Sequence, residues 1–319
     1  MAQSSSPLDV SVIVTAKDAS QTIAHAIETA LAQSCVSEVV VVDDGSTDDT
    51  AKVVEQTDDD SGRLKLIRLA QNRGPAHGRN VALEASTAPL VCILDADDFM
   101  AHDRLVKMLQ LADEDWDFLA DDIIFTEGPD DLKGYDRLFD HDLTLPKVIT
   151  LSDMILGNMP RKDRHRRETG FVKPIMRRDF LEKHKLRYDE DLKLGEDVLF
   201  YATALLEGAR FKLVEACGYY AVERADSLSS RHGTDDLTRL ANALQRFEGR
   251  VSSLGQPAES VTTYRRNIQK RGALRAALDA KRAEGWIGFA KACKDAGPDA
   301  GYVVRELVTD KISTLVRGR

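Results

Sequence analysis

The chain has 319 residues, of which 43% are hydrophobic and 30% are charged. This composition is typical of a globular protein with enough apolar material for one large domain or two modest ones. The longest apolar runs, such as residues 39–42, are too short to span a bilayer, and residues 1–7 lack the basic and apolar regions of a signal peptide. We therefore expect a cytoplasmic protein.

The cysteines argue against two kinds of stabilising site. Cys35, Cys92, Cys217 and Cys293 lie far apart, with no CxxC pair and no cluster with histidines. This spacing favours neither a zinc site nor a disulfide framework. We expect buried thiols in a reducing compartment.

The charge is unevenly distributed along the chain. Residues 235–319 hold 16 Lys and Arg against 10 Asp and Glu, whereas the first 234 residues hold 28 against 43. An acidic body argues against general nucleic-acid binding. The basic C-terminal part is compatible with peripheral contact to an anionic membrane surface, and equally with a set of solvated helix faces.

The first 125 residues predict alternating strands and helices. Short β-branched or apolar runs indicate buried strands, and apolar residues at helical spacing indicate the helices between them. Asp18 or Ser20 is expected to cap the first helix, and a hydroxyl group in the turn at residues 46–49 the second. The expected strands are residues 10–14, 39–42, 64–69, 90–94 and 118–125, and the expected helices lie around residues 23–31, after residue 46, at 75–85 and at 104–111.

The remaining chain predicts a loop region and further helices. Residues 127–170 are irregular, with one short helix near residues 152–156. Beyond residue 235 a helical pattern continues to the end of the chain. The other expected elements are helices at 178–185 and 195–206, strands at 211–214 and 219–222, and helix breaks near 255–257 and 297–298.

This order of elements predicts an α/β fold with a mostly parallel sheet and helices on both faces. In such sheets ligands bind at the carboxyl ends of the strands. Polar and acidic residues follow three of the expected strands there, at residues 15–18, 43–47 and 95–98. Crowded carboxylates are stabilised by a divalent cation, and carboxylate and phosphate oxygens suit Mg2+ or Mn2+.

Simpler explanations exist for the same residues. Asp43 and Asp44 fit a turn that enters a helix, and the acids at residues 95–98 fit the cap of the next helix. A DxD pattern alone is a weak signal in a chain with 53 acidic residues. Its position directly after an apolar strand, with a second acidic motif at another strand end, favours a ligand site.

Four motifs resemble the nucleotide-sugar half of inverting family 2 glycosyltransferases of the GT-A fold. They are Val-Ser-Val-Ile-Val-Thr at 10–15, Val-Val-Val-Asp-Asp-Gly-Ser-Thr-Asp at 41–49, Asn-Arg-Gly-Pro-Ala-His-Gly-Arg-Asn at 72–80 and Leu-Asp-Ala-Asp-Asp at 94–98. Gly-Glu-Asp at 195–197 is similar to an acidic motif in the family's second half. The resemblance implies a GT-A catalytic domain at 8–230, with a nucleotide-sugar half at 8–125 and an acceptor half at 126–230, followed by a helical C-terminal region at 231–319.

The resemblance implies residues for donor binding. Thr15, Asp43 or Asp44, and Arg79 would hold the base and ribose of a nucleotide, commonly uridine. Asp44 would accept a hydrogen bond from the pyrimidine ring. The family often has Tyr-Asn after the first strand, where this chain has Lys17 and Asp18, so Lys17 would face the donor without an aromatic ring to stack on the base.

The resemblance also implies a metal site and a catalytic base. Asp97 would bind the Mn2+ or Mg2+ that bridges the diphosphate, supported by Asp98, and Asp95 would contact the ribose, an ordered water or the metal. Asp197 would be the base that takes the proton of the acceptor hydroxyl, with Glu196 beside it as the alternative. Helix capping explains both acids without catalysis.

Other residues are weaker candidates. Ser227, Ser229 and His232 lie where the family often closes the diphosphate site, and His232 is a candidate third metal ligand, although an exposed loop histidine is the simpler explanation. The basic residues 161–167 fit either a grip on an acceptor phosphate or a solvated loop.

Three further basic side chains have two possible roles. Contact with diphosphate or acceptor and a solvated face are equally compatible with their positions after the loop region. They are Lys173, Arg177 and Arg178.

The expected reaction is addition of a single sugar. The processive members of the family carry a QxxRW motif and membrane helices, and this chain has neither. The resemblance therefore implies transfer from a UDP-hexose, such as UDP-glucose, to a carbohydrate or lipid-linked oligosaccharide acceptor, as in succinoglycan-type exopolysaccharide assembly.

Three other functions remain as alternatives. A haloacid dehalogenase phosphatase would carry its DxD after the first strand, and a sugar-nucleotide nucleotidyltransferase would carry a glycine-rich loop there. Residues 15–19 contain neither pattern. A non-catalytic nucleotide-sugar-binding protein would not need both Asp97 and Asp197.

Overall fold

The structure is a computed structural model, and it describes residues 8–113, 115–130, 136–139, 143–160, 168–223 and 233–307. The chain forms two compact units, Met1–Asp226 and Ser227–Arg319. Within the described ranges, no helix is both long and apolar enough to cross a membrane. All four cysteines carry free thiols, and Cys92 and Cys217 are buried.

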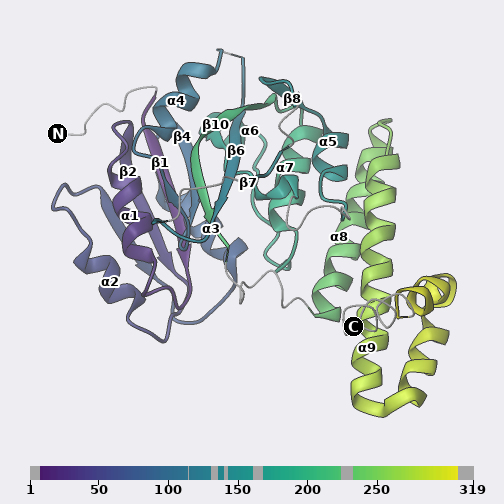
Figure 1. Cartoon of the computed structure of the whole chain (residues 1–319). Helices are drawn as coiled ribbons and strands as arrows, with labels where there is room; N and C mark the ends of the chain where they lie inside the picture. The colour runs from purple at the N-terminus through teal and green to yellow at the C-terminus, as the bar shows by residue number, and fades with distance from the viewer. Residues whose placement is uncertain are drawn as a thin grey trace. The chain divides into compact units, whose positions relative to one another are not determined.

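A parallel sheet forms the N-terminal half of the first unit (Figure 1). Its strands lie side by side in the order β3-β2-β1-β4, with every pair parallel. Strands β1 and β2 are valine-rich, β4 is aliphatic, and most of their residues are buried, as expected for strands covered on both faces. The bounds are β1 (Val10–Ala16), β2 (Val36–Asp43), β3 (Leu64–Arg68) and β4 (Leu90–Asp95).

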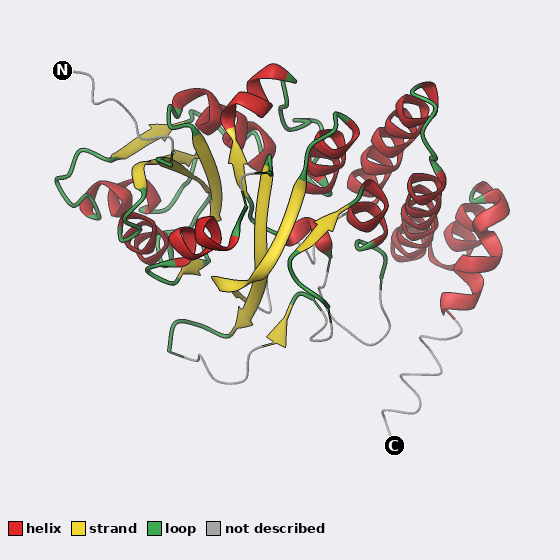
Figure 2. Cartoon of the chain, turned by 90° about the horizontal axis from the view of Figure 1, so that it is seen from above, coloured by secondary structure: helices red, strands yellow, loops and turns green. Residues whose placement is uncertain are grey.

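The connecting helices cover both faces of this sheet (Figure 2). Right-handed crossovers place α1 and α2 on one face, and α3 on the other because the chain reverses direction across the sheet between β3 and β4. Helix α1 buries Ile23, Ile27 and Leu31, the face that its spacing predicts. The bounds are α1 (Ile23–Leu31), α2 (Thr50–Gln56), α3 (Pro75–Ala85) and α4 (Arg104–Leu111).

The second half of the first unit continues the same sheet. Strand β9 (Ile175–Arg177) lies between β4 and β6 (Phe118–Thr126) and is antiparallel to both. Beyond β6 lies β10 (Phe211–Val222), which is parallel to β6. The whole sheet is therefore mixed: β9 is antiparallel to both of its neighbours, whereas the pairs on either side of it, β1 with β4 and β6 with β10, are parallel. Shorter elements are β5 (Phe99–Met100), β7 (Asp136–Arg137), β8 (Lys147–Ile149), α5 (Leu151–Leu156), a 3-10 turn (Thr169–Phe171), α6 (Arg178–Lys183) and α7 (Glu196–Leu206).

The two strands predicted near the end of this unit form one strand. β10 runs through both segments, with a register shift against β6 between Val214 and Tyr219. Gly218 sits in this irregularity with φ +111°, and a Cβ there would lie 2.4 Å from Cβ of Ala101. Glycine therefore lets β10 bend past the loop that follows β5.

The predicted helix caps are wrong in their details. The N-cap residues of α1 and α2 are Thr22 and Asp49, and neither uses a side-chain cap. Asp18 instead accepts hydrogen bonds from Thr47, through its backbone N at 2.7 Å and its hydroxyl at 3.1 Å. Ser46 Oγ accepts from Asp18 N at 2.9 Å. These hydrogen bonds link the loop after β1 to the loop after β2. The side chains of Asp18 and Ser46 are therefore used between the loops and not for capping a helix.

A buried ion pair lies behind the strand ends. Arg104 and Asp121 are both completely buried, with Nη2 of Arg104 2.7 Å from Oδ1 of Asp121. Arg104 also donates to the backbone O of Lys173 at 2.7 Å and stacks over the ring of Tyr219. The pair therefore supports two residues of the site described below.

Asp122 provides a test of pH-dependent stability. It is 4% exposed, it accepts a hydrogen bond from Phe139 N at 3.1 Å, and burial raises its pKa to about 6. An unfolded Asp titrates near 3.9, so this group reduces stability as the pH rises from about 4 to about 6 and has a constant effect above that window.

Asp122→Asn keeps an acceptor for Phe139 and removes the buried charge. We expect the variant to gain roughly 1–3 kcal/mol of stability above pH 6, with the gain disappearing towards pH 4. Urea unfolding at several pH values measures both. A variant less stable than the wild type at pH 7 would contradict the assignment.

The second unit is helical. Helix α8 (Thr234–Ser253) pairs with α9 (Glu259–Asp295), and a 3-10 turn (Gly297–Asp299) follows. Glu248 of α8 accepts from Thr262 and Arg265 of α9. Helix α9 is interrupted at Gly285, whose φ of 67° and ψ of −152° are not helical. The predicted breaks near residues 255 and 297 are present, and the break at Gly285 is additional.

Candidate active site

The strand ends of β2, β1 and β4 meet at one edge of the sheet. Thr15 is aligned with Asp95 of β4, and Ala16 with Asp43 of β2. The parallel register therefore brings together the three motifs that the sequence places after separate strands.

Asp43 and Asp44 shape the loops at this edge. Asp43 accepts from Ser46 N at 2.9 Å, and Asp44 accepts from Arg73 N and Gly74 N, both at 2.7 Å. Both carboxylates are buried. Asp43 thus serves the turn after β2, as the simpler explanation predicts, whereas Asp44 fixes the turn that leads into α3.

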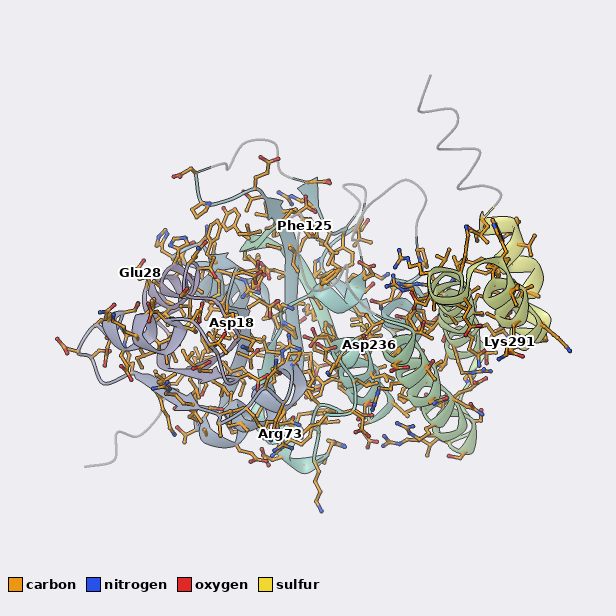
Figure 3. The ribbon with its side chains drawn as sticks, turned by 90° about the horizontal axis from the view of Figure 1, so that it is seen from below. Asp18, Glu28, Arg73, Phe125, Asp236 and Lys291 are labelled. Carbon is orange, nitrogen blue, oxygen red and sulfur yellow. The ribbon has the colours of Figure 1, made fainter. Side chains whose placement is uncertain are left out.

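Lys17 and Asp18 form an exposed ion pair at the end of β1. Nζ of Lys17 lies 2.6 Å from Oδ2 of Asp18, and this hydrogen bond lowers the pKa of Asp18. Asp18 has φ 50°, a conformation that short polar side chains tolerate. Asp18 and Arg73 are labelled in Figure 3, at the strand-end loops. Lys17 therefore lies at the edge of the sheet where the family resemblance places the nucleotide-sugar donor.

Arg79 is the centre of the site. It projects from α3 and is 5% exposed. Its Nη1 lies 3.1 Å from Oε1 of Glu196 and 3.0 Å from Oδ1 of Asp197, and its Nη2 lies 3.3 Å from Oδ1 of Asp95. Burial opposes its charge, but the carboxylates of Asp197, Asp95 and Glu196 outweigh burial and raise the pKa of Arg79.

Lys173 is a second buried cation in the same cluster. Its Nζ lies 3.0 Å from Oδ2 of Asp95 and 3.7 Å from Oδ2 of Asp197, and the residue is 3% exposed. Burial opposes its charge, but Asp95 and Asp197 outweigh burial and raise the pKa of Lys173. Of the two roles that the sequence left open for Lys173, the solvated face is excluded.

The acids Glu196 and Asp197 occupy the first turn of α7, where the helix dipole favours negative charge. Their side chains are 13% and 16% exposed. Burial and the charge of Asp197 raise the pKa of Glu196. Arg79 and Lys173 thus join the acidic motif of the second half to Asp95 at the end of β4.

Comparison with known proteins identifies the family. Residues 11–184 match Glycosyl transferase family 2. The chain is 46% identical over 281 residues to the succinoglycan biosynthesis protein ExoU of Rhizobium meliloti, covering 88% of this chain and 81% of that protein. The chain belongs to glycosyl transferase family 2. This glycosyltransferase is also 35% identical over 240 residues to ExoO of the same organism, covering 75% of this chain and 68% of that protein.

Solved structures confirm the GT-A fold of this glycosyltransferase. Staphylococcus aureus TarS 1-349 in complex with UDP-GlcNAc matches with a TM-score of 0.57 at 22% identity, over 89% of this chain and 90% of that chain. The mannosyltransferase PcManGT from Pyrobaculum calidifontis, in complex with GDP-Man and Mn2+, matches with a TM-score of 0.54 at 19% identity, over 94% and 85%. The family assignment sets aside the phosphatase and nucleotidyltransferase alternatives.

The Asp-Ala-Asp-Asp motif at residues 95–98, here called the DADD motif, has carboxylates in two different settings: Asp95 contacts cations of the site, and Asp98 is bonded to β10. Both oxygens of Asp95 contact cations, and Lys173 and Arg79 outweigh burial to lower the pKa of Asp95. Asp98 is buried and accepts from Tyr219 Oη at 2.7 Å and Val222 N at 2.9 Å. Burial, with the charges of Asp95 and Asp97, raises the pKa of Asp98 to about 8. Asp98 therefore anchors the loop to β10.

The carboxylates of Asp95 and Asp97 fit a metal that binds together with a diphosphate. In the part of the chain that the structure describes, no group of three or more His, Cys, Asp or Glu could hold a metal ion. Asp97 is partly exposed beside Asp95, and both charges bear on Asp98. One or two carboxylates completed by substrate phosphates are the usual arrangement for Mg2+, so the residues present fit that kind of site.

Several predicted residues lie elsewhere. Arg177 donates to Trp116 O, and Arg178 donates to Ala88 O, Leu83 O and Ser86 Oγ, so both stabilise the sheet rather than the site. His232, the candidate metal ligand, lies outside the described residues. The same holds for Ser227, Ser229 and the basic residues 161–167.

Tyr219 is a site residue that the sequence did not reveal. It is buried on β10 and its hydroxyl also accepts from Asp95 N at 3.3 Å. It therefore contacts both Asp95 and Asp98 from the strand beyond β6. A tyrosine in an apolar strand gives no local signal for such a role.

Proposed function

We propose that this glycosyltransferase transfers one sugar, with inversion, from a UDP-hexose to a carbohydrate or lipid-linked oligosaccharide acceptor in polysaccharide biosynthesis. The observation that carries the proposal is the bridge of Arg79 and Lys173 between Asp95 and Asp197. It brings the donor-side motif and a candidate base to one place. The similarity to ExoU and ExoO supports a succinoglycan-type pathway.

The family resemblance and the solved neighbours support a nucleotide-diphosphate donor and a divalent metal. TarS was solved with UDP-GlcNAc, and PcManGT with GDP-Man and Mn2+. We assign residues 8–125 to the donor half, 126–230 to the acceptor half and 231–319 to a helical extension. Within the donor half, Thr15, Lys17 and Asp43 would face the nucleotide.

Asp197 is the base in this proposal. Its Oδ1 accepts from Arg79, whereas its Oδ2 lies 3.7 Å from Lys173, beyond hydrogen-bond distance. We assign Oδ2 as the atom that takes the proton of the acceptor hydroxyl as that hydroxyl attacks the anomeric carbon. The two cations hold the carboxylate in place.

The donor diphosphate would leave from the opposite side of the sugar. Asp97, with Asp95, would hold the Mn2+ or Mg2+ of the donor complex. When bound, this cation would neutralise charge on the leaving group. Asp98, fixed by Tyr219 and Val222, keeps the DADD loop in position.

Thermal unfolding with a panel of nucleotides tests the donor. A ligand that binds only the folded state raises the free energy of unfolding by about 2.7 kcal/mol at 100 times its Kd, and the unfolding midpoint rises with it. We expect a rise with UDP plus Mn2+ that EDTA abolishes. A rise with GDP instead would change the donor class, and no rise with any nucleotide would contradict the proposal.

Asp97→Asn tests the metal. The variant is expected to lose the Mn2+-dependent part of UDP binding in calorimetry, because Asp95 alone, with both oxygens facing Arg79 and Lys173, would hold the cation too weakly. In the wild type, UDP and Mn2+ should strengthen each other's binding by the same factor.

Asp103→Asn is the control for the Asp97 variant, because Asp103 is an acid paired with Lys107 of α4. Unchanged UDP affinity with Mn2+ in Asp97→Asn would remove the assignment.

A further inference from the structure

Two large apolar side chains are exposed next to each other in the second unit. Trp286 is 59% exposed and Ile287 is 83% exposed. They directly follow Gly285, where α9 folds back on itself (Figure 1). The φ of 67° at Gly285 is one that only glycine adopts readily. The turn therefore holds Trp286 and Ile287 at the end of a helical hairpin, which we call the α9 tip.

The α9 tip is built to keep this shape. A Cβ at Gly288 would lie 2.6 Å from both Ala280 O and Cβ of Glu284. Glycine at this position therefore lets the segment after Gly285 pack closely against the segment before it. Trp286 also contacts Phe289 edge to face at 5.6 Å. The exposed pair thus lies on a closely packed helical hairpin rather than on an extended loop.

Positive charge surrounds the tip. Nζ of Lys281 lies 4.2 Å from the centroid of the Trp286 ring, and the side chain of Arg282 is 75% exposed, with its Nη1 4.0 Å from Oδ1 of Asp279. Lys291 and Lys294 follow Ile287 at helical spacings of four and seven, so they share its face. Lys291 is labelled in Figure 3. Between residues 281 and 294, Glu284 is the single acidic residue among four basic ones.

This combination suits a lipid surface better than a protein partner. A stable protein interface buries about 800 Å² on each partner, far more than two side chains at a convex tip can offer. A bilayer needs no complementary shape. Tryptophan favours the region between lipid headgroups and acyl chains, and lysine and arginine favour anionic headgroups. Isoleucine contributes an apolar side chain to the same insertion.

We propose that the α9 tip docks this glycosyltransferase on an anionic membrane surface, with Trp286 and Ile287 inserted and the surrounding cations on the headgroups. The proposal does not depend on the donor, the metal or the base assigned above. It assigns basic residues of the C-terminal region to a specific surface, the α9 tip.

Vesicle binding by the full-length protein tests the proposal. We expect sedimentation with vesicles containing anionic phosphatidylglycerol, weaker binding as salt rises, and little binding to phosphatidylcholine alone. The chain has two tryptophans, and Trp116 is 3% exposed. Fluorescence quenching by brominated lipids therefore reports on Trp286.

Matched variants distinguish binding through the α9 tip from non-specific adsorption of the protein to vesicles. Trp286→Ser with Ile287→Ser should lower vesicle partition at least about tenfold, and Lys291→Gln with Lys294→Gln should lower it on anionic vesicles by roughly fivefold per cation. Leu254→Ser is the control, because Leu254 is 56% exposed at the opposite end of α9, beside its N-terminus. It should bind like the wild type. Circular dichroism confirms that each variant is folded.

Three results would overturn the proposal. They are absence of binding to anionic vesicles at low salt, equal binding by the Trp286→Ser/Ile287→Ser variant, and unquenched fluorescence of Trp286 in bound protein. A change of oligomeric state in that variant, without vesicle binding by the wild type, would instead assign the tip to contact between two copies of the chain. Turnover with a water-soluble acceptor should be the same in all these variants.

Discussion

Asp197→Asn is expected to lower kcat by a factor of about 10²–10⁴, the usual contribution of a positioned general base. The substitution keeps a carbonyl oxygen for the contact from Arg79, so the site retains its shape. Donor binding should be nearly unchanged, because Asp197 is assigned to the acceptor hydroxyl and the proposed donor-binding side chains are left in place. Calorimetry with UDP measures binding, and release of UDP from the donor measures turnover.

Glu196→Gln is the matched control for the base. Glu196 neighbours Asp197 and contacts the same Nη1 of Arg79. If Asp197 is the base, Glu196→Gln should retain much more activity than Asp197→Asn. The reverse order would transfer the role to Glu196, and near wild-type rates in both would place the base elsewhere.

Arg79→Met is expected to destabilise the protein by about 3–5 kcal/mol, because removing one partner from a buried ion cluster leaves uncompensated charge. Asp95 and Asp197 would then share Lys173, and Glu196 would lose its contact with Arg79. Urea unfolding measures the loss. Adding Glu196→Gln to Arg79→Met should recover part of it, since one of the unpaired carboxylates becomes neutral.

Arg73→Met is the control for this effect. Arg73 lies six residues earlier, its side chain is 51% exposed, and it pairs with Glu190 at 3.2 Å. Exposed pairs contribute about 0–1 kcal/mol. A loss below about 1 kcal/mol for Arg79→Met would show that the cluster around Arg79 is solvated rather than buried.

The parallel half of the fold could be predicted from the sequence because its signals are local. Valine-rich strands and apolar helical spacing give each element separately, and helices α3 and α4 have the predicted bounds. Parallel pairing then brings the ends of β1, β2 and β4 together, which placed Thr15, Asp43 and Asp95 at one edge.

The rest of the site depends on contacts between distant residues, which no local pattern specifies. Strand β9 has three residues and follows Pro174, too short a segment for a periodic signal. Lys173 is buried because Asp95 and Asp197 surround it, and only the folded chain brings those two acids together. Asp18 and Ser46 bond to each other's loops instead of capping helices, since the loops meet only in the folded sheet.

The position of β9 also sets the order in which the sheet can be completed during synthesis. Strand β4 ends at Asp95, but the strand that pairs with its outer side begins at Ile175. A nascent chain that has emerged only as far as β6 therefore carries unpaired strand edges, which invite pairing with other chains. Contacts so distant in sequence also slow folding. The two halves of the first unit thus complete one sheet together, and cutting the chain between them would leave β4 as an open edge.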